Sequence, residues 1–215
     1  MRRLLTYILV AVLPTLTSCS MAGQPADLGP GRQTGTIQSP EITEASGMVA
    51  SRRQADVLWV HNDSGDKAIL YALDPQGKCL GRFHVTGARA RDWEDIALGP
   101  GPDPGQDYLY IGDIGDNRAQ REFITVYRVP EPAVVQSAPL LSGKTAPVQA
   151  IQLAFPDRAR DAETLLVDPL SGDISIISKR EVFSRVYLAQ YPHPDTSKNT
   201  KKHVSLMPWG LSGAG

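Results

Sequence analysis

The chain has 215 residues with 22 basic and 23 acidic side chains, which gives a formal net charge of −1 at pH 7. This balance argues against nucleic acid as a partner, because nucleic-acid-binding domains need a basic face. Two cysteines occur in the whole sequence, so the chain can form at most one intramolecular disulfide.

The N-terminus has the features of a bacterial export signal. Arg2 and Arg3 precede an apolar run, and "LTSC", residues 16–19, resembles a lipobox. The sequence therefore predicts a lipoprotein signal peptide at residues 1–18 and a lipidated Cys19, although an ordinary secretory signal or a short membrane anchor remains the alternative. Lipidation would hold the protein at a bacterial membrane, and Ser20 is compatible with the outer membrane or cell surface, in contact with the periplasm or the medium. Cys79 would then have no disulfide partner, so stability would depend on core burial.

Residues 19–40 form the second predicted segment, a flexible tether. Gly, Pro, Gln, Ser and Thr dominate there, and large apolar residues are almost absent. A coil of about 20 residues spans on the order of 25 Å, which is enough to hold a domain away from a membrane surface. Loss of residues 1–18 would leave 197 residues and, without Arg2 and Arg3, a net charge of −3.

Residues 41–215 read as an all-β domain, because short β-type runs alternate with Gly, Pro, Asp and Asn and no helical periodicity is sustained. An acidic start, three strands and their turns recur three times, and Tyr71, Tyr127 and Tyr187 occupy equivalent places, 56 and 60 residues apart. A fourth, outer strand fits after each unit, in "KCLGRFHVTG", "APVQAIQLAF" and "KKHVSLM". Four antiparallel strands in about 40 to 60 residues are typical of a β-propeller blade.

The fold prediction is therefore a partial β-propeller with blades at about residues 44–87, 92–155 and 161–207. A β-sandwich is the alternative, but it does not predict acidic residues that recur at the same phase. Propellers close with about four to eight blades. Three blades thus indicate either half of a six-bladed ring in a truncated chain or a natural half-propeller that dimerises. In the first case Thr34 to Gln38, "TGTIQ", would be the strand that closes the ring.

Four stretches carry a family resemblance: "EASGMVASRRQADVLWVHNDSG", "RDWEDIALGPG", "YLYIGDIGDNRAQR" and "DAETLLVDPLSGDISIISKR". Together they resemble a largely uncharacterised group of bacterial exported propellers. More loosely, they are similar to the six-bladed superfamily of NHL, gluconolactonase-like, paraoxonase-like and phytase-like domains. The superfamily resemblance implies a ligand or metal site at the mouth of the central channel. In the gluconolactonase and paraoxonase enzymes calcium is bound there by Glu, Asn and Asp.

Residues at corresponding phases are the candidates that the resemblance implies. For a metal, with Ca²⁺ as the expected ion, they are Glu44, Glu94, Asp113 and Glu163. For a ligand at the mouth they are Asn62, Asp63, Glu94, Asp113, Asp116, Asn117, Glu163 and Lys179. Side chains alternate along a strand, so "RDWEDIA" directs either Glu94 with Asp92, or Asp95 with Trp93, into the channel.

The acidic turns also allow a purely structural interpretation. Asp and Asn form Asx-turns, and Gly65, Gly112 and Gly115 would supply positive φ angles. An EF-hand is excluded for the loop from Asp113, because its third position is Gly115 and its twelfth is Ile124.

Support for catalysis is thin. No HExxH or GxSxG motif occurs, and His61, beside Asn62 and Asp63, is the one weak candidate for a general base. The favoured function is an exported, membrane-tethered propeller that binds a small molecule, glycan or protein at its channel mouth. The alternative is a calcium-dependent hydrolase of the lactonase, esterase or phosphoesterase type.

Overall fold

The computed structural model describes residues 30–63, 65, 67–135, 140–196 and 203–208 of the chain. The predicted signal peptide, Cys19 and the first part of the predicted tether lie outside these residues. Contacts divide the chain into a first unit, Met1–Gln33, and a second unit, Thr34–Gly215, and the fold described below is that of the second. The described residues contain no helix, and hence no helix long and apolar enough to cross a membrane.

Three sheets make up the second unit, which confirms the all-β prediction. The first sheet contains β1 (Ala45–Ala50), β2 (Leu58–Asn62), β3 (Ile69–Leu73), β4 (Cys79–His84) and β8 (Leu141–Lys144). The second contains β5 (Trp93–Pro100), β6 (Asp107–Asp113), β7 (Ile124–Pro130), β9 (Gln149–Ala154) and β13 (Val204–Ser205). The third contains β10 (Ala162–Val167), β11 (Ile174–Ser178), β12 (Val186–Ala189) and β14 (Met207–Pro208).

In each sheet four strands run antiparallel in chain order, as the repeat predicts, but β8 was not anticipated, nor was the pairing of β13 with the second sheet. Each is a short strand that comes shortly before the fourth antiparallel strand of the next sheet, β9 or β14, but pairs in parallel with the fourth antiparallel strand of the sheet before it, β4 or β9. The stretch "KKHVSLM" is consequently divided: Val204 and Ser205 pair with β9, whereas Met207 pairs with β12. The added strand covers backbone groups that an edge strand would otherwise leave unpaired.

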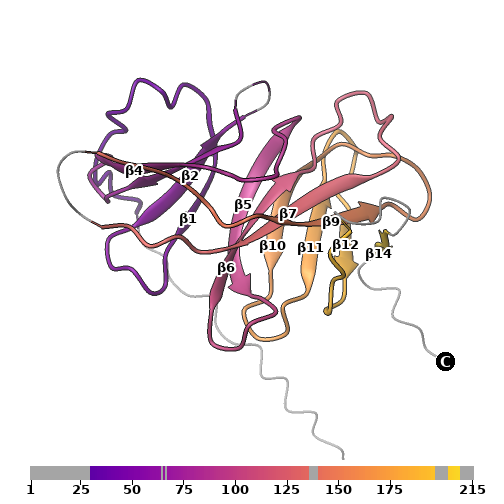
Figure 1. Cartoon of the computed structure of the whole chain (residues 1–215). Coiled ribbons are helices and arrows are strands. Elements are labelled where there is room, and N and C mark those ends of the chain that lie inside the picture. The colour runs from indigo at the N-terminus through magenta and orange to yellow at the C-terminus, as the bar shows by residue number, and fades with distance from the viewer. Residues whose placement is uncertain (1–29, 64, 66, 136–139, 197–202, 209–215) are drawn as a thin grey trace, which may run out of the picture. The chain divides into compact units, whose positions relative to one another are not determined.

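Strand register confirms the internal repeat. Tyr71, Tyr127 and Tyr187 lie opposite Val60, Ile111 and Ile176, respectively, at the same place in the three sheets. The first strand of each sheet also carries a register shift at its start, between Ala45 and Met48, between Trp93 and Asp95, and between Ala162 and Thr164. We call β1, β5 and β10 the inner strands; β5 contacts both of the others and lies between them (Figure 1).

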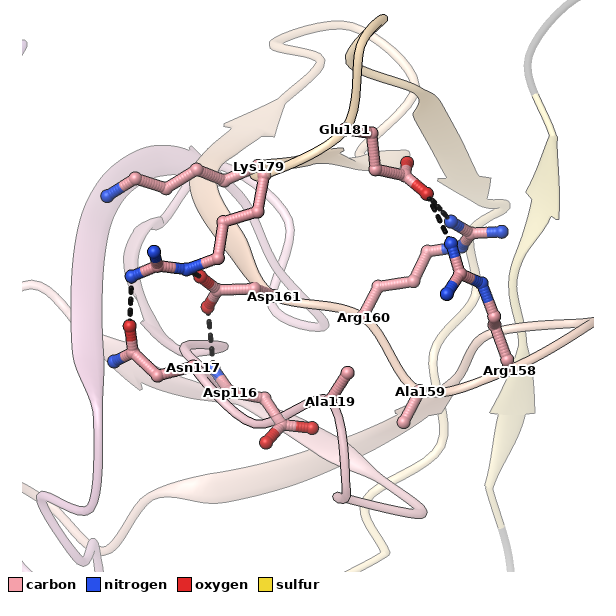
Figure 2. A pocket seen from close by; sticks show the side chains of 10 residues that line it. Asp116, Asn117, Ala119, Arg158, Ala159, Arg160, Asp161, Lys179 and Glu181 are labelled. Atoms are coloured by element: carbon pink, nitrogen blue, oxygen red, sulfur yellow. Dashed lines mark hydrogen bonds and ion pairs between the residues drawn. The ribbon is translucent and has the colours of Figure 1, made fainter.

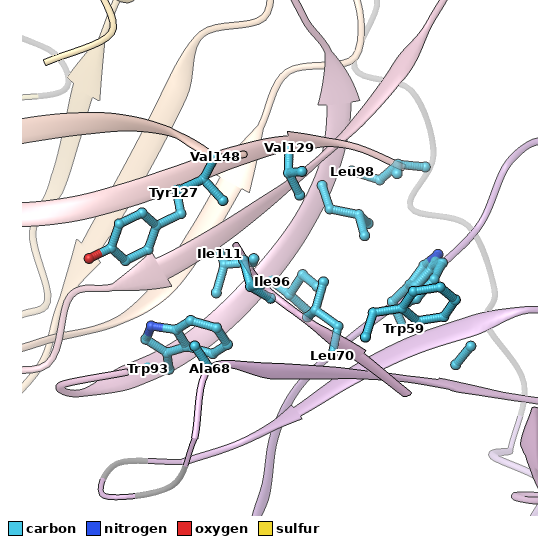
Figure 3. Packing of buried hydrophobic residues seen from close by; sticks show 14 of the residues in the cluster. Trp59, Ala68, Leu70, Trp93, Ile96, Leu98, Ile111, Tyr127, Val129 and Val148 are labelled. Atoms are coloured by element: carbon cyan, nitrogen blue, oxygen red, sulfur yellow. The ribbon is translucent and has the colours of Figure 1, made fainter. Parts of the chain in front are cut away.

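Hydrophobic side chains fill the space between successive sheets. Trp59 and Leu70 of the first sheet pack with Ile96 and Ile111 of the second in one cluster (Figure 3). A second cluster, which includes Tyr110 and Ile176, joins the second and third sheets. Because strands of the second sheet are buried on both faces, their sequences read as continuous apolar runs instead of alternating ones.

The segment before β1 differs from its prediction. Thr36 and Gln38 donate backbone hydrogen bonds to the carbonyls of Gln76 and Gly77, in the turn between β3 and β4, and the segment forms no strand. Ile37 packs on the exterior of the first sheet. The described residues 34–40, predicted as tether with a ring-closing strand, therefore form part of the β-sheet unit.

Candidate functional site

Three carboxylates converge at the ends of the strands, with one oxygen of each within 4.8 Å of the others: Asp63, Asp92 and Glu94. Asp63 directly follows β2, Asp92 precedes β5, and Glu94 lies at the register shift inside β5. We call these residues the carboxylate triad. It joins the first and second sheets at the inner strands.

The local geometry follows from a closing hydrogen bond that recurs in all three sheets. The amide of Asp63 donates to the carbonyl of Glu44 at 2.9 Å, that of Gly115 to Asp92 at 3.2 Å, and that of Lys179 to Asp161 at 2.9 Å. Each bond ties the residues after a second strand to the residue before an inner strand. Side chains at these positions are thereby collected at one end of the sheets.

Side-chain hydrogen bonds hold neighbouring inner strands together. The Ser46 hydroxyl of β1 donates to the carbonyl of Glu94 at 2.7 Å, and the amide of Leu165 in β10 donates to Asp95 Oδ2 at 2.9 Å. Asp95 is thus directed toward the third sheet while Glu94 and Asp92 converge. Of the two arrangements that strand alternation allowed, the structure has the one that brings Asp92 together with Glu94.

Gly115 lies directly against the triad. A β-carbon at this position would overlap Glu94 Oε1 and would lie 2.5 Å from Asp92 Oδ2. Among these turn glycines Gly65 has a positive φ, of 84°, whereas Gly112 and Gly115 do not, so that part of the turn interpretation is wrong. Gly115 is needed for close approach to the carboxylates and not for its backbone angles.

Charge and burial act together on Glu94, which is 8% exposed. Burial, followed by the negative charges of Glu163, Asp63 and Asp92, raises the pKa of Glu94 to about 8. Burial and the charge of Asp63 also raise the pKa of Asp92. Among the described residues no basic side chain forms an ion pair with Asp92 or Glu94, and their carboxylates accept no hydrogen bond. Asp92 and Glu94 therefore have no basic ion-pair partner among the described residues.

Three of the predicted site residues belong instead to the turn after β6. Asp113 is buried and pairs with Arg121 Nη1 at 2.7 Å. Asp116 Oδ2 accepts the amides of Gln120 and Arg121 at 2.6 and 2.7 Å, so its side chain closes the turn, although over four and five residues and not the two of an Asx-turn. The Asn117 amide oxygen accepts a hydrogen bond from Arg180. The structure brings none of these three side chains into the triad. The prediction that Asp113 is a metal ligand is therefore not supported, because its carboxylate pairs with Arg121.

The remaining predicted residues surround the triad or support it. Glu163 occupies the same bulge position in β10 as Glu94 in β5, but it pairs with Lys179. Glu44 is exposed and lies outside the triad. Asn62 is a structural residue, since its side chain donates to the carbonyl of Glu41 at 2.8 Å and accepts from the amide of Glu44 at 3.4 Å.

His61 is fully buried. Its ring packs edge-on against Trp93, with 5.6 Å between ring centroids, and its Nδ1 lies 2.8 Å from the carbonyl of Asn62. Burial lowers the pKa of His61. This placement does not support the proposed role of general base, because a dissolved substrate does not reach a fully buried ring.

Comparison with models of protein families, with curated proteins and with solved structures finds no match for the chain.

A pocket of about 100 Å³ is lined by residues of the turn after β6 and of the segments that flank β10 and β11 (Figure 2). The lining begins at Asp116, which directly follows Gly115, the glycine that lies against the triad. The basic groups of the pocket are already paired. Arg180 Nε binds Asp161 Oδ2 at 2.6 Å, and Arg158 and Arg160 both point toward Glu181 (Figure 2). Asp161 also accepts the amide of Asp116 at 2.8 Å. The basic side chains of the pocket are thus already engaged in ion pairs.

Sequence reasoning missed two parts of this site. Asp92 was absent from the predicted ligands, although strand alternation placed it with Glu94. The close approach of Gly115 has no local sequence signal, because it depends on how the turn after β6 folds over β5.

Proposed function

We propose that the chain binds a hard divalent cation, best matched by Ca²⁺, at Asp63, Asp92 and Glu94, and uses it to bind a ligand at this end of the sheets. The observation that carries the proposal is the convergence of three carboxylates without a basic partner for Asp92 or Glu94. Buried like charges must be neutralised by a proton or a cation. Carboxylate oxygens are the ligands that Ca²⁺ prefers.

The number of ligands favours binding of a further molecule. Ca²⁺ takes about six to eight oxygen ligands, and three carboxylates supply between three and six. Water or a ligand oxygen would complete the shell. A small molecule, a glycan or a protein with hydroxyl or carboxylate groups has suitable oxygens, and the paired basic residues of the neighbouring pocket offer further hydrogen-bond donors.

We also propose that the three sheets are blades of a β-propeller. The support is the in-phase register of the tyrosines, the bulge at the start of each inner strand and the recurring closing hydrogen bond. In such a fold inner strands line the axis. The triad at their ends would then lie at the mouth of the channel.

The alternative of a calcium-dependent hydrolase has less support. Besides a water on the cation, a hydrolase needs a general base or acid within hydrogen-bond reach of the reacting groups. His61 is buried, and the carboxylates of the triad would be occupied by the cation. Binding without turnover requires no further group.

Thermal unfolding in Ca²⁺, in Mg²⁺ and in a chelator tests the cation site. A cation at about 100 times its dissociation constant stabilises the folded state by about 2.7 kcal/mol, so Ca²⁺ should raise the melting temperature by several degrees. Asp92→Asn and Glu94→Gln should each abolish the shift. Glu44→Gln is the matched control, because this acidic residue also precedes an inner strand but lies outside the triad. The proposal fails if millimolar Ca²⁺ causes no shift or if Glu44→Gln removes it equally.

For location, we propose an exported lipoprotein anchored through Cys19 to a bacterial membrane. The support is the charged, apolar and small-residue order of residues 1–19. Labelling of growing cells with a fatty acid tests the modification: the wild-type chain should take up label and fractionate with membranes. Cys19→Ser should do neither, and labelling that survives this change would refute the anchor.

A further inference from the structure

The third sheet has an apolar outer face, on the side of its strands opposite to the second sheet. Its inward residues, which include Leu165, Ile176 and Tyr187, belong to the buried cluster. The alternate positions are Thr164, Leu166, Ser175, Ile177, Val186, Leu188 and Met207, and we call these seven residues the outer face of the third sheet. None of them carries a charge.

These side chains form two continuous rows across the strands. Leu166 lies opposite Ser175, Ser175 opposite Leu188, and Leu188 opposite Met207. In the neighbouring row Thr164 lies opposite Ile177, which lies opposite Val186. Leu166 is 52% exposed and Met207 is 45% exposed, while Ile177, Val186 and Leu188 are half-buried. Two of these cross-strand pairs are apolar on both sides, Ile177 with Val186 and Leu188 with Met207, so the apolar residues form a patch and are not scattered singly.

The corresponding face is buried in the other two sheets. Ser175 lies three residues before the end of β11, just as Trp59 lies three residues before the end of β2 and Tyr110 three residues before the end of β6. The three residues therefore occupy equivalent positions in the second strands of the three sheets. Trp59 packs in the cluster between the first and second sheets, and Tyr110 in the cluster between the second and third. The repeat therefore builds this face to pack against another sheet.

We infer that the outer face of the third sheet binds the same face of a second copy of this chain, with the two related by a twofold axis. Self-association of this kind places no like charges together, because the face is neutral. A head-to-tail arrangement is blocked at the first sheet. In that arrangement the outer face of the third sheet would have to pack on Val60, Tyr71 and Leu73 of the first sheet. Ile37 and Ile42 already pack on these three residues, which are at most 2% exposed. Of the two ways in which copies of this chain could pair through this face, head-to-tail or face to face, the closed, isologous dimer is the one that remains open.

Sedimentation velocity of the full chain with Cys19→Ser, which removes any lipid, tests the dimer. We expect a dimer at micromolar concentration. Leu166→Lys should weaken dimerisation more than tenfold, because it places two ammonium groups in an apolar interface. Since Leu166 is already 52% exposed in the single chain, the circular dichroism spectrum should be unchanged.

Leu170→Lys is the matched control. Leu170 is 92% exposed in the turn between β10 and β11, outside the outer face, so this variant should remain dimeric. A monomeric parent chain, an open series of larger oligomers, or a dimer that Leu166→Lys leaves intact would each overturn the inference. The inference does not depend on the cation site, and chelator should not change the dimer.

Discussion

Gly115 and Glu94 are in such close contact that a β-carbon on residue 115 would overlap the Glu94 carboxylate. The glycine is part of the turn after β6, and the glutamate is on β5, so the contact joins two strands at the triad. The backbone of the turn thereby covers one side of the carboxylates and limits the space in which a cation could bind.

Gly115→Ala should therefore weaken Ca²⁺ binding at least tenfold, which corresponds to about 1.4 kcal/mol. The added methyl group must displace either the turn or the carboxylates of Glu94 and Asp92. Isothermal titration calorimetry measures the change. Gly143→Ala is the control, because a β-carbon there would meet the ring of Phe83 at an ordinary 3.5 Å. Equal affinities in both variants would contradict the proposed position of the cation.

The pKa of Glu94 predicts a pH dependence of stability. Its pKa is about 8 in the folded state, against 4.5 for an unperturbed glutamate. Between these values the folded state holds a proton that the unfolded state has lost. In chelator, the free energy of unfolding should therefore fall as the pH rises through this range, by on the order of a few kcal/mol. Urea denaturation at both ends of the range measures it.

Two comparisons separate Glu94 from other titrating groups. Glu94→Gln should lose this part of the pH dependence, whereas Glu122→Gln, at an exposed position, should retain it. Saturating Ca²⁺ should also reduce it, since the cation replaces the proton, and the affinity for Ca²⁺ should rise with pH over the same range. A slope that persists unchanged in Glu94→Gln would assign the effect to another residue.

Asp113 and Arg121 form a buried ion pair with 3% and 5% side-chain exposure. Arg121→Met should destabilise the fold by about 3–5 kcal/mol, because it leaves a buried carboxylate without its partner. Arg82→Met removes an exposed pair with Glu41, at 41% and 46% exposure, and should cost about 0–1 kcal/mol. Chemical denaturation measures both. Adding Asp113→Asn to Arg121→Met should recover part of the loss, and full additivity would contradict a direct interaction.

Ile37 covers the first sheet although it lies in a segment without a strand. Ile37→Asp should destabilise the fold by about 1–3 kcal/mol, because it places a charge on the apolar cluster of Val60, Tyr71 and Leu73. Val182→Asp, at a residue that is 93% exposed, should change stability by less than about 0.5 kcal/mol. If both variants have the same stability, residues 34–38 do not cover this sheet in solution.

Local patterns were sufficient for most of the strands. Alternation and turn residues predicted the all-β class, and the spacing of Tyr71, Tyr127 and Tyr187 predicted equivalent places that the register confirms. The same patterns missed β8 and did not separate β13 from β14; both β8 and β13 are short and pair with strands far away in sequence. Only two to four residues form each of them, so they carry little periodic signal of their own.

For the candidate site too, the sequence predicted one part and the tertiary structure decided the other. The sequence by itself determined that acidic residues recur where inner strands begin and second strands end, because β-strand alternation and turn chemistry are local. Only the tertiary structure decided which carboxylates meet. Asp113 and Glu163 found the basic partners Arg121 and Lys179, whereas Asp92 and Glu94 converged with Asp63 without any such ion pair for the first two. Pairing between charges depends on distances across strands and turns, which no local pattern specifies.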